Sequence, residues 1–103
     1  MAKFQIWYMR PEWFRRGILG TLLDANNLAV THTHLKEIVL DAGDKPLEAV
    51  YRAMQGDVWS PCGESRGLIK SKGLQHTSMS VGDAVTDEAG HTFVVGACGF
   101  TQL

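Results

Sequence analysis

One amphipathic helix is the feature of this sequence that most restricts its possible folds. Four apolar residues recur at the i, i+3, i+4 and i+7 positions of a single helical face: Leu47, Val50, Tyr51 and Met54. Asp44 can cap this helix, Pro46 suits its first turn, and Gly56 can end it. We therefore predict a helix over residues 44–55 that buries one apolar stripe against the rest of the chain.

Segments with strand-like patterns lie on both sides of this helix. Residues 3–9 carry apolar side chains on both faces, which is typical of an interior strand covered on both sides. Residues 28–40 form a second extended region, and their β-branched positions indicate a strand at 32–39. The last quarter of the chain predicts strands at 84–86, 91–95 and 100–103, separated by turn residues.

Together these elements predict an α+β fold. Two further short helices are expected over residues 11–16 and 64–72. The chain has 103 residues and shows no repeat, linker or low-complexity segment, so we expect one domain over residues 1–103. Its sheet should be mostly antiparallel with about four to six strands, and the helix over 44–55 should pack on one face.

Composition narrows the class of partner. Ten basic and eleven acidic residues give a formal net charge of −1, and 45% of the residues are hydrophobic. This balance argues against a strongly basic nucleic-acid binder and against an acidic mimic of DNA, but it allows a local basic face. The apolar runs are too short to span a bilayer, no secretory signal is visible, and the two cysteines are far apart. We expect a cytoplasmic protein with reduced thiols and no membrane partner.

The preferred binding site is a group of cations near the middle of the chain. If residues 64–72 are helical, Arg66 and Lys70 share one face and Lys72 lies close by. With His76 they can form a positive patch that holds phosphates or an acidic protein surface, and Trp59 can stack on a base. The alternative is that Trp59 anchors the loop against the core while the lysines only solvate a helix.

A nucleophile–base pair is a second candidate site. Cys62 and His76 can form such a pair, with Glu64 or Asp83 orienting the imidazole. The sequence contains no hydrolase, zinc-protease or nucleotide-binding motif, so no catalytic residue is assigned beyond these two candidates.

Histidines suggest a possible metal site. His32 and His34 are two residues apart, so on a strand they point to the same side and can reach one ion. The alternative is that these threonine-flanked histidines face solvent on a half-exposed strand. Because no dense ligand cluster accompanies them, we assign no metal and no cofactor.

Two stretches carry a resemblance to a known group of proteins. Residues 54–69, with Trp-Ser-Pro-Cys-Gly-Glu-Ser-Arg-Gly at their centre, and residues 73–83, ending in Ser-Met-Ser-Val-Gly-Asp, resemble an uncharacterised family of small accessory proteins. Residues 8–14 and 28–35 resemble the same family, so the likeness covers most of the chain. The segment 78–100 is similar to a YodL-like module of larger mobile-element proteins. Cys62 departs from the family pattern, which has a polar turn residue such as Asn at this position.

The resemblance implies an origin on a bacterial mobile element, such as a plasmid, a phage or an integron gene cassette. The expected function is a non-enzymatic binding or accessory protein that contacts a protein or nucleic-acid partner through the basic patch. Two alternatives stay open: a small enzyme that uses Cys62 or His76, and an obligate homodimer that pairs a strand edge near residues 100–103.

Overall fold

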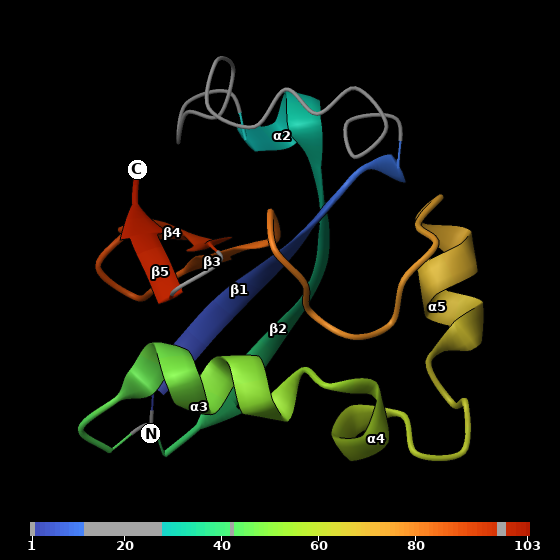
Figure 1. Cartoon of the computed structure of the whole chain (residues 1–103), viewed down its shortest axis with the longest axis horizontal. Coiled ribbons are helices and arrows are strands. Elements are labelled where there is room, and N and C mark those ends of the chain that lie inside the picture. The colour runs from blue at the N-terminus through green and yellow to red at the C-terminus, as the bar shows by residue number, and fades with distance from the viewer. Residues whose placement is uncertain (1, 12–27, 42, 97–98) are drawn as a thin grey trace.

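The fold is built on one antiparallel sheet, seen in a computed structural model that describes residues 2–11, 28–41, 43–96 and 99–103 (Figure 1). The described strands pair in the order β2-β1-β3-β4-β5. Their bounds are Ala2–Met9 for β1, His32–Leu40 for β2, Ala84–Thr86 for β3, Thr92–Gly96 for β4 and Gly99–Gln102 for β5. The predicted α+β class with a mostly antiparallel sheet is confirmed.

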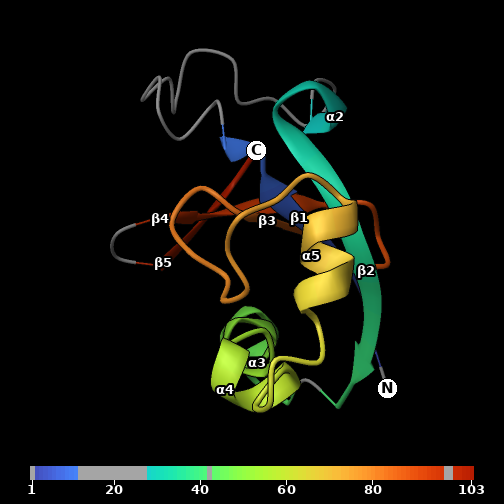
Figure 2. The same cartoon turned by 90° about the vertical axis from the view of Figure 1, so that its right-hand side faces the viewer.

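Helical segments accompany the sheet between β1 and β3 in the sequence. Their bounds are Leu28–Thr31 for α2, Pro46–Ala53 for α3, Gly56–Trp59 for α4 and Arg66–Ser71 for α5. Figure 2 shows the sheet close to edge-on, with α3 and α4 on one side of it. No helix in the described ranges has both the length and the apolar character needed to cross a bilayer.

The core lies between α3 and the face of the sheet that α3 covers. Ile6 and Tyr8 of β1 and Val50 of α3 are fully buried, and Met54 is 1% exposed. The same cluster also contains Phe4, Leu35, Ile69, Leu74, Met79, Val85 and Val95. Burial of these side chains drives the assembly, because each fully buried large apolar side chain contributes roughly 1.5–3 kcal/mol.

A bulge in β2 sets which of its residues face the core. Ile6 pairs with Lys36 and Trp7 pairs with His34, so Leu35 has no partner on β1. Leu35 is only 3% exposed and belongs to the core cluster. The extra residue shifts the alternation of the strand, since two residues on one side of a bulge oppose one on the other.

The strand predictions are confirmed to within two residues at each end, and three local predictions are wrong. Residues 28–31 form the short helix α2 instead of the start of an extended region. The N-cap of α3 is Lys45 with no side-chain cap hydrogen bond, so Asp44 does not cap the helix. The C-cap of α3 is Met54, and Gly56 begins α4 instead of ending α3; α4 itself was not predicted. The predicted helix over 11–16 lies outside the described residues beyond Pro11.

Candidate functional site

Three exposed cations on and beside α5 form the surface that the sequence predicted. Arg66 and Lys70 lie one turn apart on the helix and Lys72 follows its end; all three are exposed. Ile69, on the other side of α5, is 6% exposed and holds the helix against the core. Within the described residues, no carboxylate forms an ion pair with these cations. We call Arg66, Lys70 and Lys72 the α5 cationic surface.

The turn before α5 positions Arg66. Gly63 has a φ of +81°, and a Cβ added to it would lie 3.0 Å from Nε of Arg66, so the arginine side chain lies against this turn. The carboxylate of Glu64 accepts a hydrogen bond from the backbone N–H of Cys62 at 3.0 Å. Backbone hydrogen bonds from Glu64 itself and from Cys62 lower the pKa of the Glu64 carboxyl. Glu64 therefore stabilises the turn through this hydrogen bond and stays ionised near the start of α5.

Trp59 anchors its loop against the core, which was the alternative to stacking on a base. Its half-buried side chain packs against the core, and its indole Nε1 donates to the carbonyl oxygen of Thr77 at 3.1 Å. The ammonium group of Lys36 lies 5.0 Å from the centre of its ring. Trp59 therefore holds the segment around Thr77 to α4, and the α5 cationic surface consists of the three cations alone.

Asp83 is a buried carboxylate that joins separate segments of the described chain. It is fully buried, and Oδ1 accepts the backbone N–H of Met9 at 2.8 Å. Its Oδ2 accepts the backbone N–H of Ser80 and Nε2–H of His76, both at 2.8 Å. Asp83 thus orients the imidazole of His76. It was one of the two residues predicted for this role. It also holds the end of β1 to the turn before β3.

His76 completes a cluster with Tyr8. The His76 and Tyr8 rings stack with centroids 4.5 Å apart and planes inclined by 12°. The hydroxyl of Tyr8 donates to the carbonyl oxygen of Thr77 at 2.6 Å. Burial, with a smaller contribution from the negative charge of Asp83, raises the pKa of Tyr8, so its phenol stays neutral. We call these three residues the Tyr8–His76–Asp83 cluster. The contact of Tyr8 with His76 was not predicted from the sequence.

Cys62 lies on the exposed turn between α4 and α5. Its described hydrogen bond goes to Glu64, whereas the described partners of His76 are Asp83 and Tyr8. Cys62 and His76 thus share no described partner. Their pairing as nucleophile and base stays a prediction.

The two histidines of the metal hypothesis lie on one face of the sheet, as predicted, because they pair with Met9 and Trp7 of β1. His32 is fully buried, with Nε2 2.6 Å from the carbonyl oxygen of Gly82 and Nδ1 2.6 Å from the Thr31 hydroxyl. A carbonyl only accepts, so Nε2 carries the proton and Nδ1 accepts from the hydroxyl.

His34 has a partner of its own on β1. Its Nε2 lies 2.6 Å from Oε1 of Gln5, so this nitrogen donates to the amide oxygen. Among the described residues no group of three or more ligating side chains is arranged to hold a metal ion. Both histidines therefore act within the fold, and the predicted exposure of His32 to solvent is wrong.

Acidification should weaken the fold through His32. Burial lowers the pKa of His32, with Arg10 adding to this effect and the Gly82 carbonyl and Asp83 opposing it. Below about pH 6.5 the unfolded chain therefore binds a proton at this residue more readily than the folded chain does. The free energy of unfolding should fall as pH decreases through that value, and less so in a His32→Gln variant.

Urea denaturation followed between about pH 8 and pH 5 measures this dependence. His91→Gln, at a histidine whose side chain is 57% exposed, is the control and should follow the wild type. Equal pH slopes in the wild type and in His32→Gln would contradict the role given to burial.

Two constellations thus stand out in the described residues: the exposed α5 cationic surface and the largely buried Tyr8–His76–Asp83 cluster. The α5 cationic surface exposes positive charges to solvent. The hydrogen bonds of the Tyr8–His76–Asp83 cluster join segments of the chain to one another. Comparison of the chain with protein-family models, with curated proteins and with solved structures gave no match.

Proposed function

We propose that this protein is a non-enzymatic binding module of a bacterial mobile element that contacts the phosphate groups of nucleic acid through the α5 cationic surface. The supporting observation is the exposure of Arg66 and Lys70 on α5, a short helix that contains no acidic residue, and of Lys72 directly after it. The mobile-element origin is an expectation from the resemblance of the sequence. An acidic protein surface is the competing partner for the same cations.

The arrangement favours contacts to a phosphate backbone over reading of bases. Arg66 and Lys70 are separated by about 6 Å along the helix axis, so they can contact neighbouring phosphates. Trp59 is engaged with Thr77 and Lys36, and His76 is engaged with Asp83 and Tyr8. Without an aromatic group in the surface, binding should depend on salt and little on base sequence.

Replacing all three cations of the α5 cationic surface with Ala should abolish most of the salt-dependent binding. Each phosphate contact contributes a slope of about −0.9 to the dependence of log K on log salt concentration, so the slope should become shallower by about 2 to 3. Fluorescence anisotropy with labelled duplex and single-stranded DNA, at about 50 to 200 mM salt, measures this slope.

The matched control is a triple variant that removes the same charge from elsewhere, K3A/K45A/R52A, since these three cations are also exposed. It should retain the wild-type slope. Equal losses in the two triple variants would show that net charge, and not the α5 cationic surface, governs binding. A wild-type protein that binds an acidic polypeptide but neither form of DNA would favour the competing partner.

A further inference from the structure

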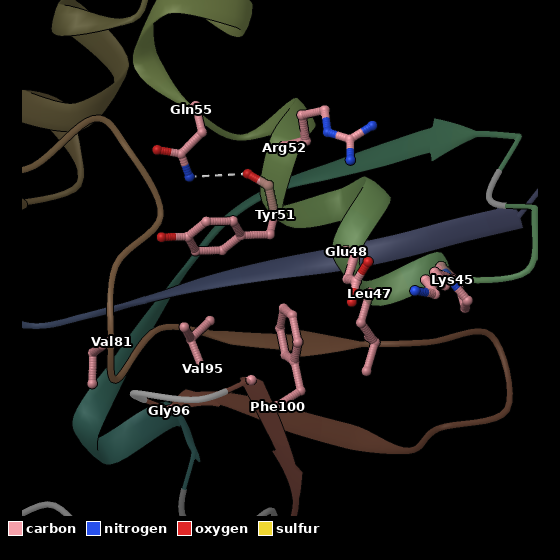
Figure 3. Close-up of a pocket in the computed structure, with 12 residues that line it drawn as sticks. Lys45, Leu47, Glu48, Tyr51, Arg52, Gln55, Val81, Val95, Gly96 and Phe100 are labelled. Carbon is pink, nitrogen blue, oxygen red and sulfur yellow. Dashed lines mark hydrogen bonds between the residues drawn. The ribbon is translucent and has the colours of Figure 1, made fainter.

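A groove of about 820 Å³ separates α3 from the end of the sheet formed by β4 and β5 (Figure 3). Figure 3 shows Phe100 and Val95 pointing from the strands towards the helix, and Leu47 pointing from the helix towards Phe100. Tyr51 meets Phe100 edge to face, with ring centroids 6.4 Å apart. Tyr51 and Val81 remain 38% and 45% exposed at this groove, which therefore has an uncovered apolar lining.

Gly99 and Phe100 of β5 lie at one side of the groove. β5 is the last strand of the sheet and pairs only with β4 in the part of the chain that the structure describes. Leu103 donates its backbone N–H to Thr92 of β4 at 2.9 Å. Backbone groups alternate in direction along a strand, so Thr101 also points them towards β4. Phe100 and Gln102 then direct their N–H and C=O groups away from β4, towards the open edge.

The hydrogen bonds of Val95 agree with this assignment. Val95 lies opposite Phe100 in the register of β4 with β5. Its N–H donates to the carbonyl oxygen of Asp83, and its C=O accepts from Gly82, both at 2.8 Å on the side of β3. Val95 and Phe100 therefore form a non-hydrogen-bonded pair of the antiparallel ladder, in which both residues direct their N–H and C=O groups away from each other. The backbone groups of Phe100 thus lie on the edge of β5 that faces away from β4.

We propose that an extended peptide segment of another protein binds as an added strand along the open edge of β5, beside the groove. An extended backbone is what matches donors and acceptors repeated every two residues, as Phe100 and Gln102 present them. Side chains alternate along such a segment, so every second one lies on the face of the sheet that carries Phe100, and those near Gly99 and Phe100 adjoin the groove. The partner therefore carries apolar residues at alternate positions. The groove volume lies within the range of about 300–1,000 Å³ that is usual for ligand sites.

The charges around the groove fit a peptide better than a nucleic acid. Lys45 and Arg52 of the rim are accompanied there by Glu48, and a neighbouring depression adds Asp41 and Asp44. Neither sign dominates, whereas a phosphate backbone requires an excess of cations. The groove is thus a site of a different kind from the α5 cationic surface.

A second copy of this chain is a less suitable occupant than a free segment. Pairing two β5 strands about a two-fold axis joins the two sheets, and each copy then brings its own α3 to the same face. The side chains of an added strand need the space beside Phe100, which Tyr51 of the α3 already present contacts. A separate peptide brings only its own backbone and side chains into that space.

Selection from a phage-displayed library of random peptides of about six residues, against the immobilised full chain, supplies the probe. Enriched peptides should show apolar residues at alternate positions. The best of them, made synthetically, should slow hydrogen exchange of the Phe100 and Gln102 amides by about tenfold or more. Failure to enrich any peptide, or protection confined to other amides, would overturn the proposal.

Two variants of one residue separate backbone pairing from side-chain contact. Gln102→Pro removes an outward N–H without removing a bond to β4, and should weaken peptide binding by about tenfold or more. Gln102→Ala keeps that N–H and should bind within about twofold of the wild type. Equal binding by the two variants would refute strand addition at β5.

Two further measurements exclude the other sites and occupants. The triple Ala variant of the α5 cationic surface should bind the selected peptide as the wild type does, whatever happens to its binding of DNA. Light scattering of the peptide-free protein should give the mass of one chain. A dimer that Gln102→Pro dissociates would assign the groove to a second copy and overturn the peptide proposal.

Discussion

Replacing Asp83 with Ala should lower the free energy of unfolding by about 3 to 5 kcal/mol, the usual cost of breaking a buried charged contact from one side. The variant leaves the N–H groups of Met9 and Ser80, and Nε2–H of His76, without their acceptor. Each unsatisfied buried donor costs about 1 to 3 kcal/mol, and solvent entering the new space offsets part of this sum. Urea denaturation of the full chain measures the difference.

Asp83→Asn tests how much of this loss comes from geometry. The amide keeps one acceptor oxygen but turns N–H groups towards donors, so we expect a loss between those of the wild type and the Ala variant. Asp41→Ala, at an exposed carboxylate, is the control and should change stability by less than about 0.5 kcal/mol. A loss of under about 1 kcal/mol in Asp83→Ala would show that water replaces the carboxylate, and that the cluster does not hold β1 to the turn before β3.

Tyr8→Ala should cost about 3 to 5 kcal/mol, because it deletes a fully buried aromatic ring from the central part of the core. Tyr8→Phe should cost only about 1 kcal/mol. The Phe variant keeps the ring and the stacking on His76, and the Thr77 carbonyl still accepts from Trp59 at 3.1 Å. The difference between the two variants separates the contribution of the ring from that of the hydroxyl.

A double-mutant cycle of Tyr8→Ala with His76→Ala measures the stacking itself. The coupling energy should be about 0.5 to 1.5 kcal/mol, as for other aromatic pairs. Additive losses would contradict the view that the cluster acts as a unit. A Tyr8→Phe loss as large as that of Tyr8→Ala would instead assign the stability to the hydroxyl and its bond to Thr77.

The α5 cationic surface shows what helical spacing predicts about a site. Arg66 and Lys70 are exposed on one short helix, as their separation by four residues indicates, and Ile69 is buried on the other side. The two other predicted members of the site do not follow from spacing. Trp59 donates a hydrogen bond to Thr77. His76 contacts Asp83 and Tyr8. The group that an indole or imidazole contacts depends on which segments the fold brings together. The residues nearby in the sequence do not determine this contact.

His32 shows the same limit more sharply. As a threonine-flanked histidine at the start of a strand, it was expected either to bind a metal or to face solvent. The structure buries it completely between Thr31 and the Gly82 carbonyl, 50 residues away along the chain. The short helix α2, which places Thr31 beside the ring, was itself missed by the sequence analysis.

Local patterns of this sequence were sufficient for the helix α3 and for all five described strands. The apolar repeat indicated α3, because burial of one face imposes a repeat on neighbouring residues, and apolar, β-branched and turn residues indicated the strands. Sheet order, the contacts of Asp83 and the groove beside β5 were decided only by tertiary structure. Met9 and Asp83 are 74 residues apart, and α3 and β5 meet although most of the chain between them lies elsewhere. Such contacts depend on which surfaces pack together, and the free energy of packing belongs to the whole chain and to no single segment.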